Sequence, residues 1–80
     1  IRIVFFGRPA DRLGGERALD GPEDGLSVIE LRRRIAASAD GGDILLDPAI
    51  RSAVDGVECG DDAWVRPGQE AAFFSIFSGG

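Results

Sequence analysis

The two most apolar runs of this 80-residue chain stand at its two ends. Ile1–Phe6 consists mostly of β-branched and aromatic residues, and Ala71–Phe74 ends in two consecutive phenylalanines. Both runs are short and rich in the residue types that favour strands. A chain of this size has a single hydrophobic core. We expect the first and last strands, as the most apolar ones, to lie side by side in the centre of one sheet.

One main helix is predicted between these strands. Ser27 and Glu30 have the spacing of a capping box, in which the Ser27 hydroxyl accepts from the Glu30 amide and the Glu30 carboxylate reaches back. Apolar residues then recur at helical spacing. They are Val28, Leu31, Ile35 and Ala39. The helix is therefore expected over Val28–Ala39.

The three consecutive arginines of this segment are expected to lie on the helix surface. Arg33 and Arg34 point away from the apolar face. Arg32 falls inside the apolar sector, where its stem can pack while its charged head reaches water.

The remaining segments are short strands and turns. Strands are expected over 16–20, 51–55, 57–59 and 69–74, with Asp55-Gly56 as a hairpin turn, and Trp64 as a core or rim residue. The segment 44–46 is predicted to be a short buried connection. The order of two hairpins joined by one crossover helix is the β-grasp arrangement of ubiquitin-like domains. We therefore predict an α+β fold with a mixed sheet of four to five strands, a domain over residues 1–74 and a flexible tail over 75–80.

The amino acids that are missing exclude several functions. The chain has no His, Lys or Tyr, and acid–base catalysis near neutral pH relies most often on His. No Ser-His or Cys-His pair and no His-containing metal site can form, so an enzyme acting alone is not expected. The net charge of −5 argues against nucleic-acid binding. No apolar stretch is long enough to span a bilayer, and a single cysteine, Cys59, fits a reducing cytoplasm.

The chain carries too many aromatic residues for one buried face. A sheet covered by one helix buries one side, and its other side should be polar. Adjacent phenylalanines in a strand must point to opposite faces, so Phe6 and Phe74 are expected outside. With Ile76 and Phe77 they would form an exposed apolar patch, and such patches mark interaction sites.

The sequence ends in Gly79-Gly80. A tail without Cβ atoms at its last two positions can enter a narrow tunnel and offer its terminal carboxyl to an enzyme. A frayed end is the alternative interpretation, and Gly-Gly by itself is a weak signal.

Together these residues resemble the family of molybdopterin synthase small subunits. The matching segments are Val4–Gly7, Pro67–Phe74 and the Ser78–Gly80 end. In that family the terminal glycine is adenylated by an enzyme similar to those that activate ubiquitin and is then converted to a thiocarboxylate. The charged tail enters the large subunit, where its sulfur passes to cyclic pyranopterin monophosphate during molybdenum cofactor biosynthesis.

The resemblance implies roles for individual residues and for partners. Gly80 would carry the sulfur and Gly79 would supply clearance, while Phe6, Phe74 and the tail residues Ile76, Phe77 and Ser78 would contact partners. No cofactor would be bound by this chain, and ATP would be used by the activating partner. The implied partners are the large subunit in a heterotetramer, a ubiquitin-activating-like adenylyltransferase, and a sulfur donor such as a cysteine desulfurase or a rhodanese-like protein.

The chain departs from the family pattern in two places. Ser75-Ile76 stand where the family commonly has two prolines, and Phe77 replaces a smaller residue, so the tail should be more flexible and bulkier. Ala10-Asp11 replace a frequent Arg-Glu pair, and the contact made by that arginine is expected to be missing or to move to Arg12.

Three other functions fit the same sequence. A sulfur carrier for thiamine, cysteine or tRNA thiolation would use the same chemistry at Gly80. A ubiquitin-like modifier would form isopeptides with lysines of other proteins. A plain β-grasp binding module would function without Gly80. Cys59 and the loop acids Asp40, Asp43, Asp61 and Asp62 are interpreted as ordinary surface or packed side chains.

Overall fold

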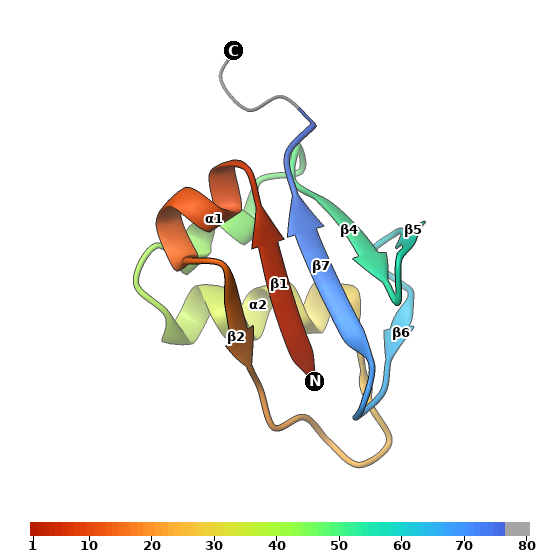
Figure 1. Ribbon diagram of the computed structural model, residues 1–80. Helices are drawn as coiled ribbons and strands as arrows, with labels where there is room; N and C mark the ends of the chain where they lie inside the picture. Colours follow the sequence, from red (N-terminus) through yellow and green to blue (C-terminus); the bar gives the residue numbers. More distant parts are fainter. Residues whose placement is uncertain (77–80) are drawn as a thin grey trace.

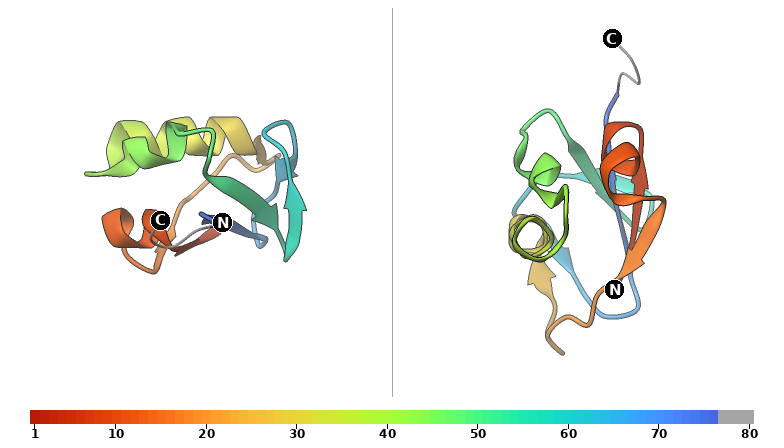
Figure 2. Two further views of the ribbon diagram at one scale, coloured as in Figure 1. Left: turned by 90° about the horizontal axis from the view of Figure 1, so that it is seen from above. Right: turned by 90° about the vertical axis from the view of Figure 1, so that its left-hand side faces the viewer.

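The computed structural model describes residues 1–76, which form one mixed sheet crossed on one face by one main helix (Figure 1, Figure 2). The elements in chain order are β1 (Arg2–Phe6), α1 (Arg8–Leu13), β2 (Glu16–Ala18), β3 (Leu26–Ser27), α2 (Val28–Ser38), the 3₁₀ turn η1 (Gly42–Leu46), β4 (Arg51–Val54), β5 (Val57–Cys59), β6 (Trp64–Val65) and β7 (Glu70–Phe74). The five-stranded sheet has the order β2-β1-β7-β4-β5, and β3 pairs with β6 separately. This arrangement confirms the predicted α+β, β-grasp-like fold.

The two ends of the sequence meet in the centre of the sheet, as predicted. β1 and β7 pair in parallel, with Phe5 opposite Phe73 and Phe6 opposite Phe74, whereas the other strand pairs of this sheet are antiparallel. Parallel neighbours need a crossover connection, and the chain that contains α2 provides it. Both strands therefore end at the same edge of the sheet (Figure 1).

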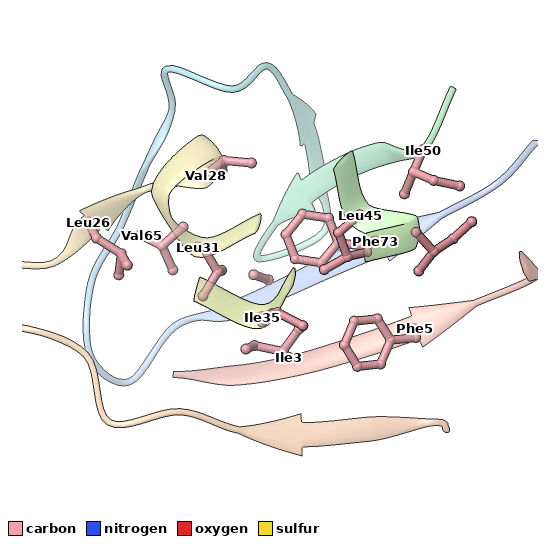
Figure 3. Close-up of a cluster of buried hydrophobic side chains, with 12 residues drawn as sticks. Ile3, Phe5, Leu26, Val28, Leu31, Ile35, Leu45, Ile50, Val65 and Phe73 are labelled. Atoms are coloured by element: carbon pink, nitrogen blue, oxygen red, sulfur yellow. The ribbon is translucent and has the colours of Figure 1, made fainter. Parts of the chain in front are cut away.

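The core lies between the sheet and α2 (Figure 3). Phe73 is fully buried, and its ring stacks on that of Phe5 with the centroids 6.3 Å apart. The other members of the cluster are aliphatic: Ile3, Leu26, Val28, Leu31, Ile35, Ile44, Leu45, Ile50, Val65 and Ala71. The last strand is thus fixed to the helix by its largest side chain.

One half of the predicted capping box forms at the start of α2: the Ser27 hydroxyl caps the helix, but the Glu30 carboxylate bonds to Arg34 instead of reaching back to Ser27. The Ser27 Oγ accepts from the Glu30 amide at 3.2 Å. The Glu30 carboxylate accepts from Arg34 Nε at 3.3 Å, one turn further along the helix. The helix ends at Ser38, one residue before the predicted end, and Ala39 is its extended C-cap.

The prediction for Arg32 was wrong, because its charged head is buried. The residue is 6% exposed, and its guanidinium donates to the carbonyl oxygens of Leu45 at 2.8 Å and Ile50 at 2.6 Å. The group also lies 5.2 Å from the centre of the Phe73 ring. Its Nε is 3.0 Å from an oxygen of Asp61, near enough for an ion pair but not aligned for a hydrogen bond. The carbonyls of the connection before β4 face the core, and a buried carbonyl needs a donor.

We expect Arg32→Met to lower the free energy of unfolding by about 2–3 kcal/mol, because two buried carbonyl groups lose their donors. Arg33→Met is the matched control on the exposed side of α2, and we expect a change within about 0.5 kcal/mol. Urea unfolding of both variants measures the difference. Equal stability of the two would show that the guanidinium contributes nothing to the fold.

The segment 44–46 is only partly buried, which corrects the prediction of a buried connection. Ile44 and Leu45 are in the core, but Leu46 is 53% exposed. These residues lie in η1, and a 3₁₀ turn has three residues per turn. Three consecutive side chains therefore point in three directions and cannot all face the core.

Candidate functional site

The candidate site lies where β1 and β7 end, next to each other, before the chain continues into the tail (Figure 1). Phe5 and Phe73 point to the helix side, and their successors Phe6 and Phe74 point to the open side, because side chains alternate along a strand. Phe6 is 58% exposed, and Phe74 is half-buried. Both phenylalanines take the faces that the sequence predicts.

We define the exit patch as Phe6, Phe74 and Ile76. Ile76 follows β7 by two residues and is 58% exposed. The other exposed large apolar side chains of residues 1–76 lie on other elements: Leu46, Val57 and Trp64. Trp64 is a rim residue, and its Nε1 donates to the Asp24 carbonyl at 2.6 Å. The remaining predicted site residues, Phe77, Ser78, Gly79 and Gly80, lie outside the described residues.

A charged rim borders the exit patch. Arg51 stands opposite Phe74 on β4, so Phe6, Phe74 and Arg51 form one row across three strands on the open face. Arg51 also forms an ion pair with Glu58. A groove of about 400 Å³ opens beside the end of β7, lined by Arg8, Pro48, Ala49, Arg51, Ser75 and Ile76. An apolar centre with a polar border is the usual anatomy of a protein interface.

Asp47 contacts two of the residues that line this groove, Ala49 and Arg8. Its carboxylate accepts from the Ala49 amide at 2.9 Å and from Arg8 Nη2 at 3.3 Å. The Ala49 amide, and to a lesser extent the Arg8 guanidinium, lowers the pKa of this carboxyl below its ordinary value. The Asp47 carboxylate therefore remains ionised at neutral pH. No local sequence pattern indicates that Arg8, distant in the chain, would contact this carboxylate.

Ser75 makes a contact that the sequence analysis missed. Its Oγ accepts a hydrogen bond from the Arg8 amide at 3.0 Å, across 67 positions of sequence. Gly7 stands beside it with a φ of 68°, and a Cβ at Gly7 would lie 2.3 Å from the Ser75 Oγ. No local pattern reports such a contact, because it depends on the register of β1 with β7.

Arg12, to which a partner contact was expected to move, makes a contact within this chain instead. Arg12 Nη1 lies 3.9 Å from the carboxylate of Asp43. Ala10 is half-buried and packs against the core. The exposed Arg12 remains available to a partner only in competition with this long ion pair.

A second groove, of about 340 Å³, has Arg32, Cys59 and Asp61 among its lining residues. Cys59 is half-buried, with its sulfur 4.0 Å from the Ser52 Oγ. Within the described part of the chain, no group of three or more His, Cys, Asp or Glu side chains is placed to hold a metal ion. In the same residues no helix has the length and apolar character needed to cross a membrane.

No protein-family model matches the sequence, and no curated protein matches it significantly. Function is therefore inferred from the residues of the chain, from the exit patch and from the contacts around the end of β7.

Proposed function

We propose that this chain is the sulfur-carrying small subunit of a molybdopterin synthase. The observation that carries the proposal is the exit patch, which surrounds the point where the last strand leads into the segment that ends in Gly79-Gly80. The partners of a carrier must accept its C-terminal segment, so the carrier needs a surface that they recognise where this segment begins. Phe6, Phe74 and Ile76 supply such a surface, and aromatic anchors are frequent hot spots of interfaces.

The fold supports a carrier in a second way. β7 lies between β1 and β4, and Phe73 is fully buried beneath α2. The base of the tail is therefore held on a rigid element, which is what precise presentation of a reacting group requires. Partners that bind the exit patch would receive the tail at a fixed place.

In this proposal the chemistry occurs at the carboxylate of Gly80. The carboxylate attacks the α-phosphorus of ATP to give an acyl adenylate and pyrophosphate. The persulfide of the sulfur donor then displaces AMP to give an acyl disulfide, and a thiol of the partners cleaves its S–S bond, which releases the thiocarboxylate and leaves a disulfide on the donor side. The large subunit then directs that sulfur to cyclic pyranopterin monophosphate, and the chain returns to its carboxylate form. The activating enzyme supplies ATP binding, and the partners supply acid–base groups, in a cytoplasmic assembly. A chain without His or Lys suits this role, because it serves as a reagent that is regenerated each cycle.

The intact mass of the chain tests the proposal. After incubation with ATP, its activating enzyme and a sulfur donor, the mass should rise by the difference between sulfur and oxygen. An unchanged mass, under conditions that charge a known carrier, would contradict a sulfur-carrier function.

Phe6→Ala is expected to weaken binding to the large subunit by about 30-fold, the effect of losing a typical aromatic hot spot. The free energy of unfolding should change by only about 0.5 kcal/mol, because the side chain is largely exposed. Calorimetric titration with the large subunit measures the binding. Val57→Ala removes a side chain that is 69% exposed on β5, outside the exit patch, and serves as the control. Wild-type affinity in Phe6→Ala would remove the patch from the interface.

A further inference from the structure

Where the chain leaves the sheet after β7, Ser75 contacts Arg8, which lies just after β1. The strands pair up to Phe6 opposite Phe74. Beyond this pair, the amide of Arg8, two residues after Phe6, donates to the Oγ of Ser75, one residue after Phe74, at 3.0 Å. The contact extends the association of the two central strands beyond their last paired residues.

The Arg8 amide is free to make this bond because it stands at the start of α1. The first amides of a helix have no partner within the helix. Gly7, at the N-cap, makes no side-chain capping bond. Ser75 therefore supplies an acceptor to this helix start, as a cap residue would, but from the opposite end of the sequence.

Gly7 leaves the space in which the Ser75 hydroxyl lies. Its φ of 68° is in the region that favours glycine, and an added Cβ would lie 2.3 Å from the Ser75 Oγ. The Ser75 hydroxyl thus occupies the space that a side chain at position 7 would need. Gly7, which follows β1, and Ser75, which follows β7, thus contribute to one contact. This contact fixes the course of the backbone at Ser75.

We infer that Ser75 is a positioning residue, whose bond to the Arg8 amide sets the course of the chain at residues 75–76, from which the segment ending in Gly80 is offered to its partners. The inference rests on the proposed function, because it concerns recognition of the tail by the activating enzyme. Proline would restrain this position through its ring, and Ser75 restrains it through a hydrogen bond. The tail is expected to be more flexible because it lacks the two prolines. The hydrogen bond of Ser75 offsets this flexibility at the first residue of the tail.

Steady-state kinetics of the adenylation of Ser75→Ala by the activating enzyme test this role. The release of pyrophosphate measures the rate. If only part of the molecules present the tail correctly, apparent affinity falls in proportion. We expect the KM for the carrier to rise about three- to tenfold, the range for loss of one hydrogen bond, with kcat unchanged. Ser75→Thr keeps the acceptor and should retain the wild-type KM. Ser38→Ala, which removes a hydroxyl from the far end of α2, is the matched control.

A measurement independent of the enzyme reports on the contact itself. Hydrogen exchange of the Arg8 amide should be faster in Ser75→Ala than in the wild type and in Ser38→Ala. Gly7→Ala should raise the KM as well, because its Cβ displaces the hydroxyl. In the Ser75→Ala background its effect should be smaller, since residues in contact are not additive.

The outcomes separate this inference from the proposed function. A wild-type chain that is never adenylated would overturn both. A wild-type chain that is adenylated, with the same KM in Ser75→Ala, would overturn the positioning role alone. An equal rise in KM for Ser38→Ala would also contradict it, since the effect would then not be specific to the contact with Arg8.

Discussion

Phe73→Ala is expected to lower the free energy of unfolding by about 3–5 kcal/mol, the usual cost of removing a buried phenylalanine. The side chain is fully buried, stacks on Phe5 and lies beneath the Arg32 guanidinium. Its loss leaves a cavity between β7 and α2 and removes the aromatic partner of a buried cation. Such a change is a large part of the stability of a small domain, and chemical unfolding monitored by circular dichroism measures it.

Phe74→Ala is the matched control, one residue further along the same strand. Its side chain points to the open face and is half-buried, so we expect a loss below about 2 kcal/mol. The order reverses for function: Phe74→Ala should weaken partner binding at the exit patch, whereas folded Phe73→Ala should retain that surface. Equal destabilisation of the two variants would contradict the assignment of opposite faces.

Deletion of Gly80 is expected to reduce thiocarboxylate formation by at least about 100-fold. The new terminal carboxyl would fall short by one residue, about 3.3–3.6 Å of extended chain, and a displacement of about 1 Å from a reacting geometry can already cost 100-fold. The described fold ends at β7 and Ile76, so the melting temperature should not change. Intact-mass spectrometry after timed incubation with ATP, the activating enzyme and a sulfur donor gives the rate.

Gly80→Ala separates the effect of tail length from the effect of a side chain at the last position. This variant keeps the length of the tail but adds a methyl group beside the carboxyl, so we expect it to be charged more slowly than the wild type and faster than the deletion variant. Wild-type charging of the deletion variant would move the reacting group away from Gly80.

The sequence predicted those features that depend on local pattern. The apolar runs at the two ends predicted the central pairing of β1 with β7, and the alternation of side chains placed Phe6 and Phe74 on the open face. The spacing of Ser27 and Glu30 predicted the start of α2. The faces of the phenylalanines and the start of α2 follow from residues close together in the chain, whereas the pairing of β1 with β7 was predicted from the apolar character of both ends.

The features that the sequence missed depend on contacts between distant segments. Arg32 is buried because two carbonyls of the connection before β4 turn toward it, and nothing within α2 reports their positions. The bond from the Arg8 amide to Ser75 depends on strand register and on the space left by Gly7. Leu46 is exposed because its segment forms a 3₁₀ turn. Tertiary geometry decides all three.

Transfer of sulfur from the charged chain tests the central proposal most directly. The thiocarboxylate form, labelled with ³⁵S, would be mixed with the large subunit and cyclic pyranopterin monophosphate. The account predicts that the label moves to the pterin product and that the mass of the chain returns to that of the carboxylate. Retention of the label on the chain in this mixture would contradict the account. Transfer of the label to a thiamine, cysteine or tRNA acceptor in place of the pterin, or formation of isopeptides with other proteins, would contradict it as well.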